Sequence, residues 1–89
     1  MKIFFTKHVN DKLQEEEIKK VGITGEKIVN VLKNPVVVDE ESVPHHSVGK
    51  LSESLSLNVI WKIENRAKKV ITFYPAGKGR YESKILRRR

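Results

Sequence analysis

The ten residues from Leu55 to Glu64 constrain the fold most, because apolar and polar side chains alternate along them. One face of this stretch carries Leu55, Leu57, Val59, Trp61 and Ile63, and the other carries Ser56, Asn58, Ile60, Lys62 and Glu64. A period of two is typical of a β-strand with one buried face. Residues 65–68 then predict a hairpin connection and residues 69–74 a return strand, so an antiparallel sheet occupies the second half of the chain.

The first half of the chain has the spacing and the capping residues of helices. Thr6 is placed to cap a helix that starts at the next residue and ends at Gly22. Thr24 is placed to cap a second helix, which ends at Asn34-Pro35 because the residue before a proline resists the α conformation. Ahead of both helices, residues 1–5 predict a short strand.

Shorter segments complete the expected order of elements. Val36–Val38 predicts a short strand, residues 42–49 a loop or an irregular edge, residues 75–79 a break in the sheet, and residues 80–86 a final short strand. Helices grouped before strands favour an α+β fold in which one face of the sheet packs on the helices. The other face is expected to meet solvent or a ligand, and it carries Asn58, Lys62, Thr72 and Tyr74.

Size and charge narrow the possible functions. The chain has 89 residues, which is room for one core, so we expect one domain over residues 1–86 and a basic tail at 87–89. Residues 1–45 carry 7 Lys/Arg and 8 Asp/Glu, a net charge of −1, whereas residues 46–89 carry 11 and 3, a net charge of +8. This asymmetry indicates a surface for a polyanion, and nucleic acid is the expected one.

Several kinds of chemistry find no support in the residues. The chain has no cysteine, which removes disulfides, thiolate zinc sites and a cysteine nucleophile. It has no glycine-rich phosphate loop and no nucleophile elbow. His45 and His46 are adjacent and point to opposite sides of an extended chain, so no metal or other cofactor is predicted. The longest apolar runs are three residues, so no membrane segment or export signal is predicted, and the expected location is the cytoplasm.

The chemistry that remains is metal-free cleavage of RNA. RNA carries its own nucleophile, the 2′-hydroxyl, so a protein needs a base, an acid for the leaving oxygen and cations that hold the phosphate. The candidates for catalysis are Lys62, Arg80, Tyr81, His45, His46 and His8. The candidates for RNA binding are Lys50, Arg66, Tyr74, Lys78, Arg87, Arg88 and Arg89.

Each candidate also has an ordinary structural explanation. The histidines fit loop, packing or capping positions, and the helix dipole near His8 favours its neutral imidazole. Lys62 and Arg66 fit solvated charges on a strand and a turn. Tyr74 and Tyr81 fit the edge of a core. These alternatives stay open at the level of sequence.

Five short motifs also carry a resemblance to a known family. They are Phe5-Thr6-Lys7-His8, Gly22-Ile23-Thr24, Asn34-Pro35, Asn58-Val59-Ile60-Trp61 and Val70-Ile71-Thr72-Phe73-Tyr74-Pro75. Together they resemble a family of small prokaryotic proteins that is similar to the BrnT and RelE toxins. The resemblance implies a RelE-like fold, in which two N-terminal helices pack on a curved antiparallel sheet of three to five strands.

The same resemblance implies an activity and partners. It implies the toxin of a type II toxin–antitoxin pair, an endoribonuclease that acts on RNA at or away from the ribosome and is neutralised by a cognate antitoxin. By position, Lys62, Arg80 and Tyr81 are the nearest matches to the basic residues and the tyrosine that RelE-type toxins use. Two alternatives are a non-catalytic RNA- or ribosome-binding module and a small protein-interaction domain that forms a homodimer.

Overall fold

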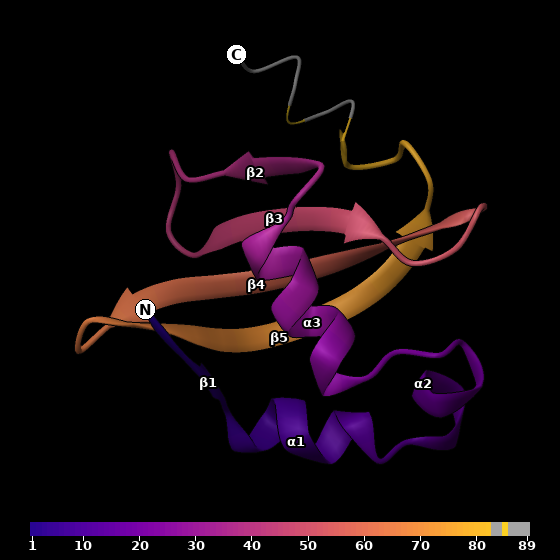
Figure 1. Cartoon of the computed structure of the whole chain (residues 1–89), viewed down its shortest axis with the longest axis horizontal. Coiled ribbons are helices and arrows are strands. Elements are labelled where there is room, and N and C mark those ends of the chain that lie inside the picture. Colours follow the sequence, from indigo (N-terminus) through magenta and orange to yellow (C-terminus); the bar gives the residue numbers. More distant parts are fainter. Residues whose placement is uncertain (83–84, 86–89) are drawn as a thin grey trace.

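The computed structural model of the chain describes residues 1–82 and residue 85, and it has an α+β fold (Figure 1). The elements in chain order are β1 (Lys2–Phe5), α1 (Lys7–Leu13), α2 (Glu16–Lys20), α3 (Gly25–Lys33), β2 (Val37–Asp39), β3 (His45–Lys50), β4 (Leu55–Glu64) and β5 (Ala67–Gly77). The expected α+β class, with helices before the main strands, is therefore confirmed.

The five strands form one sheet in the order β1-β5-β4-β3-β2. The strands β2 to β5 form an antiparallel meander, whereas β1 runs parallel to β5 at the sheet edge. The fully antiparallel sheet that we expected is therefore a mixed one. The three helices connect β1 at one edge of the sheet to β2 at the opposite edge. Strand β1 therefore pairs with β5, the last strand in the sequence, and not with β2.

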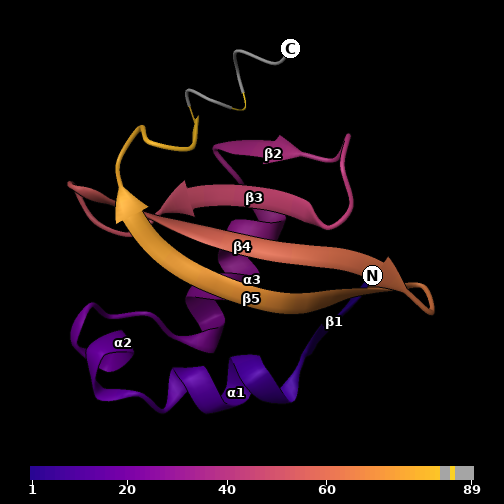
Figure 2. The ribbon, with the colours of Figure 1, turned by 180° about the vertical axis from the view of Figure 1, so that it is seen from behind.

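The helices α1 to α3 pack on one face of the sheet, and the other face is covered in part by the turn after β5. Helix α3 contacts β3 and β4, and α1 contacts β5 near the edge of the sheet (Figure 1). The main core lies between these layers and includes Val9, Ile28, Leu57, Val59, Trp61, Val70 and Phe73. Seen from behind, the strands lie in front of α3, and this face of the sheet is called the open face below (Figure 2).

The first helical region is divided into two helices, where the sequence predicted one. The Thr6 hydroxyl accepts the N–H of Val9 and begins α1 as expected, but α1 ends at Leu13. Ile18 lies five residues after Leu13, about 140° around a helix, so one straight helix cannot bury both. The break turns Ile18 into the core. Within the described part of the chain, no helix is long and apolar enough to cross a membrane.

The loop expected over residues 42–49 is wrong, because β3 occupies most of it. Strand β3 lies between β2 and β4 and pairs with β4 from His45 to Lys50. Ser47 and Gly49 lie on the side of β3 that faces the helices. Serine is small and polar and glycine has no side chain, so the sequence of β3 shows no alternation of apolar and polar residues. A Cβ atom on Gly49 would lie 2.6 Å from Cγ2 of Val31, so α3 packs closely only because this residue is glycine.

The end of the chain also differs from the prediction. Strand β5 continues through Pro75 to Gly77, where a break was expected. Strand β1 pairs with β5 only from Ala67 to Val70, so Pro75 has no neighbouring strand on its outer side and its missing N–H costs no ladder bond. The strand expected over residues 80–86 is not formed, because Glu82 and Ile85 have helical backbone and the Ile85 N–H donates to the Tyr81 carbonyl.

Candidate functional site on the open face

Polar and aromatic side chains gather on the open face where β3, β4 and β5 lie side by side. The group consists of His46 on β3, Asn58 on β4, Tyr74 on β5, and Arg80 and Tyr81 in the turn after β5, and we call it the open-face cluster. Asn58 lies opposite Tyr74 in the ladder between β4 and β5. The turn after β5 brings Tyr81 back over these strands, where its ring meets those of His46 and Tyr74.

A chain of hydrogen bonds fixes the orientation of the His46 ring. Its Nε2 atom lies 2.8 Å from Oδ1 of Asn58. The other end of the amide, Nδ2 of Asn58, donates to the Tyr74 carbonyl at 3.4 Å. Because Oδ1 can only accept, Nε2 of His46 carries the proton and donates. In the neutral ring, Nδ1 is therefore the atom with a free lone pair.

The tyrosines and Arg80 complete the open-face cluster. The Tyr81 ring lies edge-on to His46, with centroids 5.5 Å apart, and edge-on to Tyr74 at 5.6 Å. The Arg80 guanidinium lies 5.3 Å from the centre of the Tyr81 ring, within cation–π range. Burial, and then the charge and hydrogen bond of Tyr81, raise the pKa of the Tyr74 hydroxyl, so it stays protonated at neutral pH.

Asn58 is buried completely, although the sequence placed it on a face that meets solvent or a ligand. Tyr74 and His46 hydrogen-bond to it from both sides, and the turn after β5 lies over the same region of the sheet. A second buried polar residue, Asp39, lies directly opposite His46 in the ladder between β2 and β3 and is 4% exposed. His46 therefore has a carboxylate as its neighbour across the strands.

Lys62 lies near the hairpin end of β4, four residues beyond Asn58 of the open-face cluster. Its ladder partner on β5 is Lys69, whereas His46 lies opposite Ile60, two residues before Lys62. The Lys62 ammonium lies 3.2 Å from Glu64, and Lys62 and then Lys69 lower the pKa of that carboxyl. Lys62 therefore lies along the strand from His46, and its ammonium is paired with Glu64.

The remaining predicted residues also lie outside the open-face cluster. His45 points to the opposite side of β3 from His46, as expected, and its ring meets Trp61 edge-on at 4.6 Å. His8 lies on α1, with Nε2 3.2 Å from the Thr72 hydroxyl. Arg66 is exposed in the tight turn between β4 and β5. Arg87, Arg88 and Arg89 lie outside the described residues.

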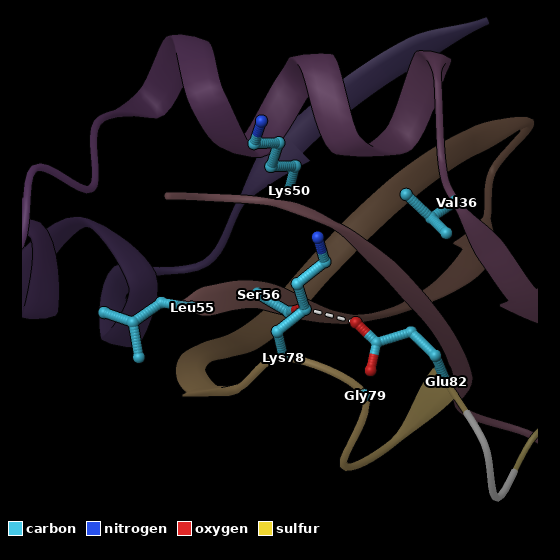
Figure 3. Close-up of a pocket in the computed structure, with 7 residues that line it drawn as sticks. All are labelled: Val36, Lys50, Leu55, Ser56, Lys78, Gly79 and Glu82. Carbon is cyan, nitrogen blue, oxygen red and sulfur yellow. Dashed lines mark hydrogen bonds between the residues drawn. The ribbon is translucent and has the colours of Figure 1, made fainter. Parts of the chain in front are cut away.

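A pocket lies next to the open-face cluster, at the start of β4 (Figure 3). Its volume is about 390 Å³, and it is lined by Val36, Lys50, Leu55, Ser56, Lys78, Gly79 and Glu82. We call it the Glu82 pocket. It brings together two predicted RNA-binding residues, Lys50 and Lys78, that are 28 positions apart in the sequence.

The Glu82 carboxylate is the distinctive group of this pocket. It accepts a hydrogen bond from the Ser56 hydroxyl through Oε1, and Figure 3 shows it pointing toward that residue. Oε2 is buried without a hydrogen-bond partner. Burial raises the pKa of this carboxyl, but Ser56 and the backbone N–H groups of Glu82, Gly79 and Tyr81 together lower it more. The carboxylate is therefore charged at neutral pH.

Sequence reasoning placed Asn58 on this face without naming it as a site residue, and it missed Asp39 and Glu82. Only Asn58 had a visible signal, since it is an amide in the middle of a strongly apolar strand. Within residues 1–82 and 85, no three potential metal-ligating side chains come together. Comparisons with protein-family models, with curated proteins and with solved structures found no match.

Proposed function

We propose that the protein binds RNA on the open face of its sheet and cleaves it without a metal ion. The observation that carries this proposal is the open-face cluster, where an oriented histidine, two tyrosines and an arginine meet. Metal-free cleavage of RNA needs these kinds of groups, namely a base, an acid and a cation.

In the proposed reaction, Nδ1 of His46 takes the proton of the 2′-hydroxyl as this oxygen attacks the adjacent phosphorus. The bond from phosphorus to the 5′-oxygen breaks, and that oxygen takes a proton from the Tyr81 hydroxyl. The products are a 2′,3′-cyclic phosphate and a free 5′-hydroxyl. Arg80 binds the non-bridging oxygens, whose negative charge grows in the transition state.

The contacts of His46 support its role as the base. The donor bond from Nε2 to the buried Asn58 holds the ring in one tautomer, which leaves Nδ1 as the proton acceptor. Asn58 is itself fixed by the Tyr74 carbonyl. Asn58 therefore acts as a positioning residue, and it does not touch the RNA.

Charge supports RNA as the ligand. Residues 46–82, which include β3, β4, β5 and the turn of this site, carry 7 Lys/Arg and 3 Asp/Glu, a net charge of +4. Lys50 and Lys78 at the neighbouring pocket extend the cationic surface beyond Arg80. The resemblance to RelE-type toxins adds a biological role to this proposal, in which a cognate antitoxin covers the open face and blocks access to RNA.

Cleavage of a defined RNA by the purified protein, in the presence of a chelator, tests the proposal. We expect a 2′,3′-cyclic phosphate product from the wild type, and a loss of about 100-fold or more in rate for His46→Ala. His8→Ala is the matched control, because it removes an exposed histidine outside the open-face cluster. Intact RNA with folded wild-type protein, or equal loss in both variants, would contradict the proposal.

A non-catalytic RNA-binding module is the second candidate, and the spread of cations favours it. Lys62, Arg66, Lys68 and Lys69 lie at the end of β4 and β5 that is farthest from the open-face cluster. A basic surface of this length contacts several phosphates rather than one. Tight, salt-sensitive binding that leaves RNA intact in the same experiment would support this function.

A further inference from the structure

Two lysines and a glutamate meet on the open face, near the hairpin between β4 and β5. Lys62 lies directly opposite Lys69 in the ladder, so their side chains share one face of the sheet. The Lys62 ammonium lies 3.2 Å from one carboxylate oxygen of Glu64, and the Lys69 ammonium lies 3.4 Å from the other. Two cations from neighbouring strands therefore hold one anion between them, and the proposed cleavage uses none of these three groups.

This arrangement fits a backbone phosphate as well as it fits a carboxylate. Lysines that lie directly opposite each other repel, so an anion between them is favourable. A phosphodiester, like a carboxylate, presents two oxygens that share one negative charge. The three side chains are 37–42% exposed, and exposed ion pairs contribute little to stability, so Glu64 can turn into solvent at low cost when a phosphate takes its place.

An exposed aromatic ring continues the same row of side chains across the sheet. Phe4 on β1 lies opposite Lys69, and it is 53% exposed. A pocket of about 180 Å³ lies beside the ring, and it is lined by Phe4, Phe5, Thr6, Glu64, Asn65 and Lys69. Proteins bind single-stranded nucleic acid with aromatic rings beside cations, because every base has a face that can stack.

The row lies on the same face as the open-face cluster, further along β4. Lys62 is four residues beyond Asn58, about 13 Å along the strand, which an extended single strand of RNA covers with about two nucleotides. Figure 2 shows this face, with the N-terminus beside the end of β4 and the chain after β5 leaving from the other end of the sheet. One RNA strand with a phosphate at Arg80 therefore reaches Lys62 and Lys69 with another phosphate.

We propose that Phe4, Lys62 and Lys69 form a second nucleotide subsite on the open face. The two ammoniums bind a backbone phosphate, the Phe4 ring stacks on a base, and Glu64 holds the phosphate position while the protein is free of RNA. Glu64 is thus a built-in competitor that the RNA displaces. The inference rests on the proposed function for its ligand, RNA, and it applies to binding with or without cleavage.

Binding of a hexauridylate with 2′-methoxy groups, which cannot be cleaved, tests the phosphate position. We expect Glu64→Gln, which removes the competing charge, to bind this probe about fivefold more tightly than the wild type. Loss of any negative charge favours RNA to some extent, so Glu53→Gln, at an exposed acid between β3 and β4, is the matched control and should gain less. In the double variant Lys62→Ala, Lys69→Ala, the further change Glu64→Gln should bring no more gain than Glu53→Gln does.

The variant Phe4→Trp measures the stacking of a base. Trp61 is the chain's own single tryptophan and is 3% exposed, so a change of fluorescence on binding reports on the new indole. We expect the hexauridylate to quench this fluorescence, and an abasic oligonucleotide of the same length, which has phosphates but no bases, to leave it unchanged. Phe4→Leu keeps apolar bulk without an aromatic face, and it should bind the hexauridylate about fivefold or more weakly than the wild type.

The outcomes separate the subsite from the proposed function. Equal effects of Glu64→Gln and Glu53→Gln, or a Phe4→Trp variant that binds the hexauridylate without quenching, overturn the subsite while RNA binding itself stands. Absence of binding of the wild type at low salt overturns the RNA-binding function and the subsite together. If Phe4→Leu does not fold, the quenching of Phe4→Trp and the two glutamate variants still decide the result.

Discussion

Nε2 of His46 lies 2.8 Å from Oδ1 of Asn58, and the asparagine is fully buried. A partly buried imidazole is thus held by a side chain that solvent does not reach. The arrangement fixes which ring nitrogen is protonated without using a charged partner. It also ties the chemistry proposed for the open face to the packing of β4, because Asn58 cannot move without disturbing the sheet.

Replacing Asn58 by alanine should lower both stability and cleavage. The change leaves the Tyr74 carbonyl and Nε2 of His46 without their partner, which costs about 2 kcal/mol in the free energy of unfolding. Chemical denaturation and RNA cleavage measure the two effects. Asn30→Ala, which removes an exposed bond between Asn30 and Asn34 on α3, serves as the control. Unchanged cleavage in Asn58→Ala would contradict the positioning role.

Gly49→Ala should destabilise the fold through a clash with α3. The new Cβ atom would lie 2.6 Å from Cγ2 of Val31, so helix and strand must separate, at a cost of about 1–3 kcal/mol. Gly77→Ala is the matched control, because nothing lies within 4 Å of its Cβ position. Denaturation midpoints of both variants, and of the double variant Gly49→Ala, Val31→Ala, check the prediction. If the double variant loses as much stability as Gly49→Ala and Val31→Ala do in sum, the contact is not the cause.

Acid should weaken the fold partly through Glu82. Its pKa is lower in the folded protein than in the unfolded chain, so its contribution to stability is complete above the unfolded value and is lost as pH falls through the folded one. The wild type should therefore be more stable than Glu82→Gln at pH 7, and the difference should shrink as pH drops below about 4. Thermal unfolding from pH 7 to pH 3 measures it, and a constant difference would refute the prediction.

RNA binding should depend on salt through the lysines of the Glu82 pocket. Each phosphate contact releases about one counterion, so Lys50→Ala and Lys78→Ala should each reduce the slope of log affinity against log salt by about 1. Lys33→Ala, at the end of α3 on the opposite side of the sheet, should leave the slope unchanged. The slopes come from anisotropy titrations at several salt concentrations. Equal slopes for all variants would place the RNA elsewhere.

Local features of the fold were predictable from the sequence, and features that depend on distant partners were not. Thr6 and Thr24 cap helices as expected, because a cap needs only the next three residues. The alternation in Leu55–Glu64 identified β4 for a similar reason. Strand β3 was missed because Gly49 and Ser47 are small to fit α3 and Trp61, which are far away in the sequence.

The same contrast between local features and features that depend on distant partners applies to the candidate site. The sequence named His46, Tyr74, Arg80 and Tyr81 among its candidates by chemical type, but only the sheet and the turn after β5 bring these four together, while the Lys62 ammonium pairs with Glu64. Glu82 was overlooked because a single acid in a basic segment carries no pattern. Its importance appears only when the turn after β5 places it against Ser56.

The parallel pairing of β1 with β5 determines when β1 joins the sheet during synthesis. Lys2 pairs with Ala67, so β1 has no neighbouring strand until β5, which is made much later, follows it. The groups of the open face come from β3, β4, β5 and the turn beyond, which also emerge late. A growing chain therefore holds β1 and its helices before it has any part of the chemistry proposed for the open face.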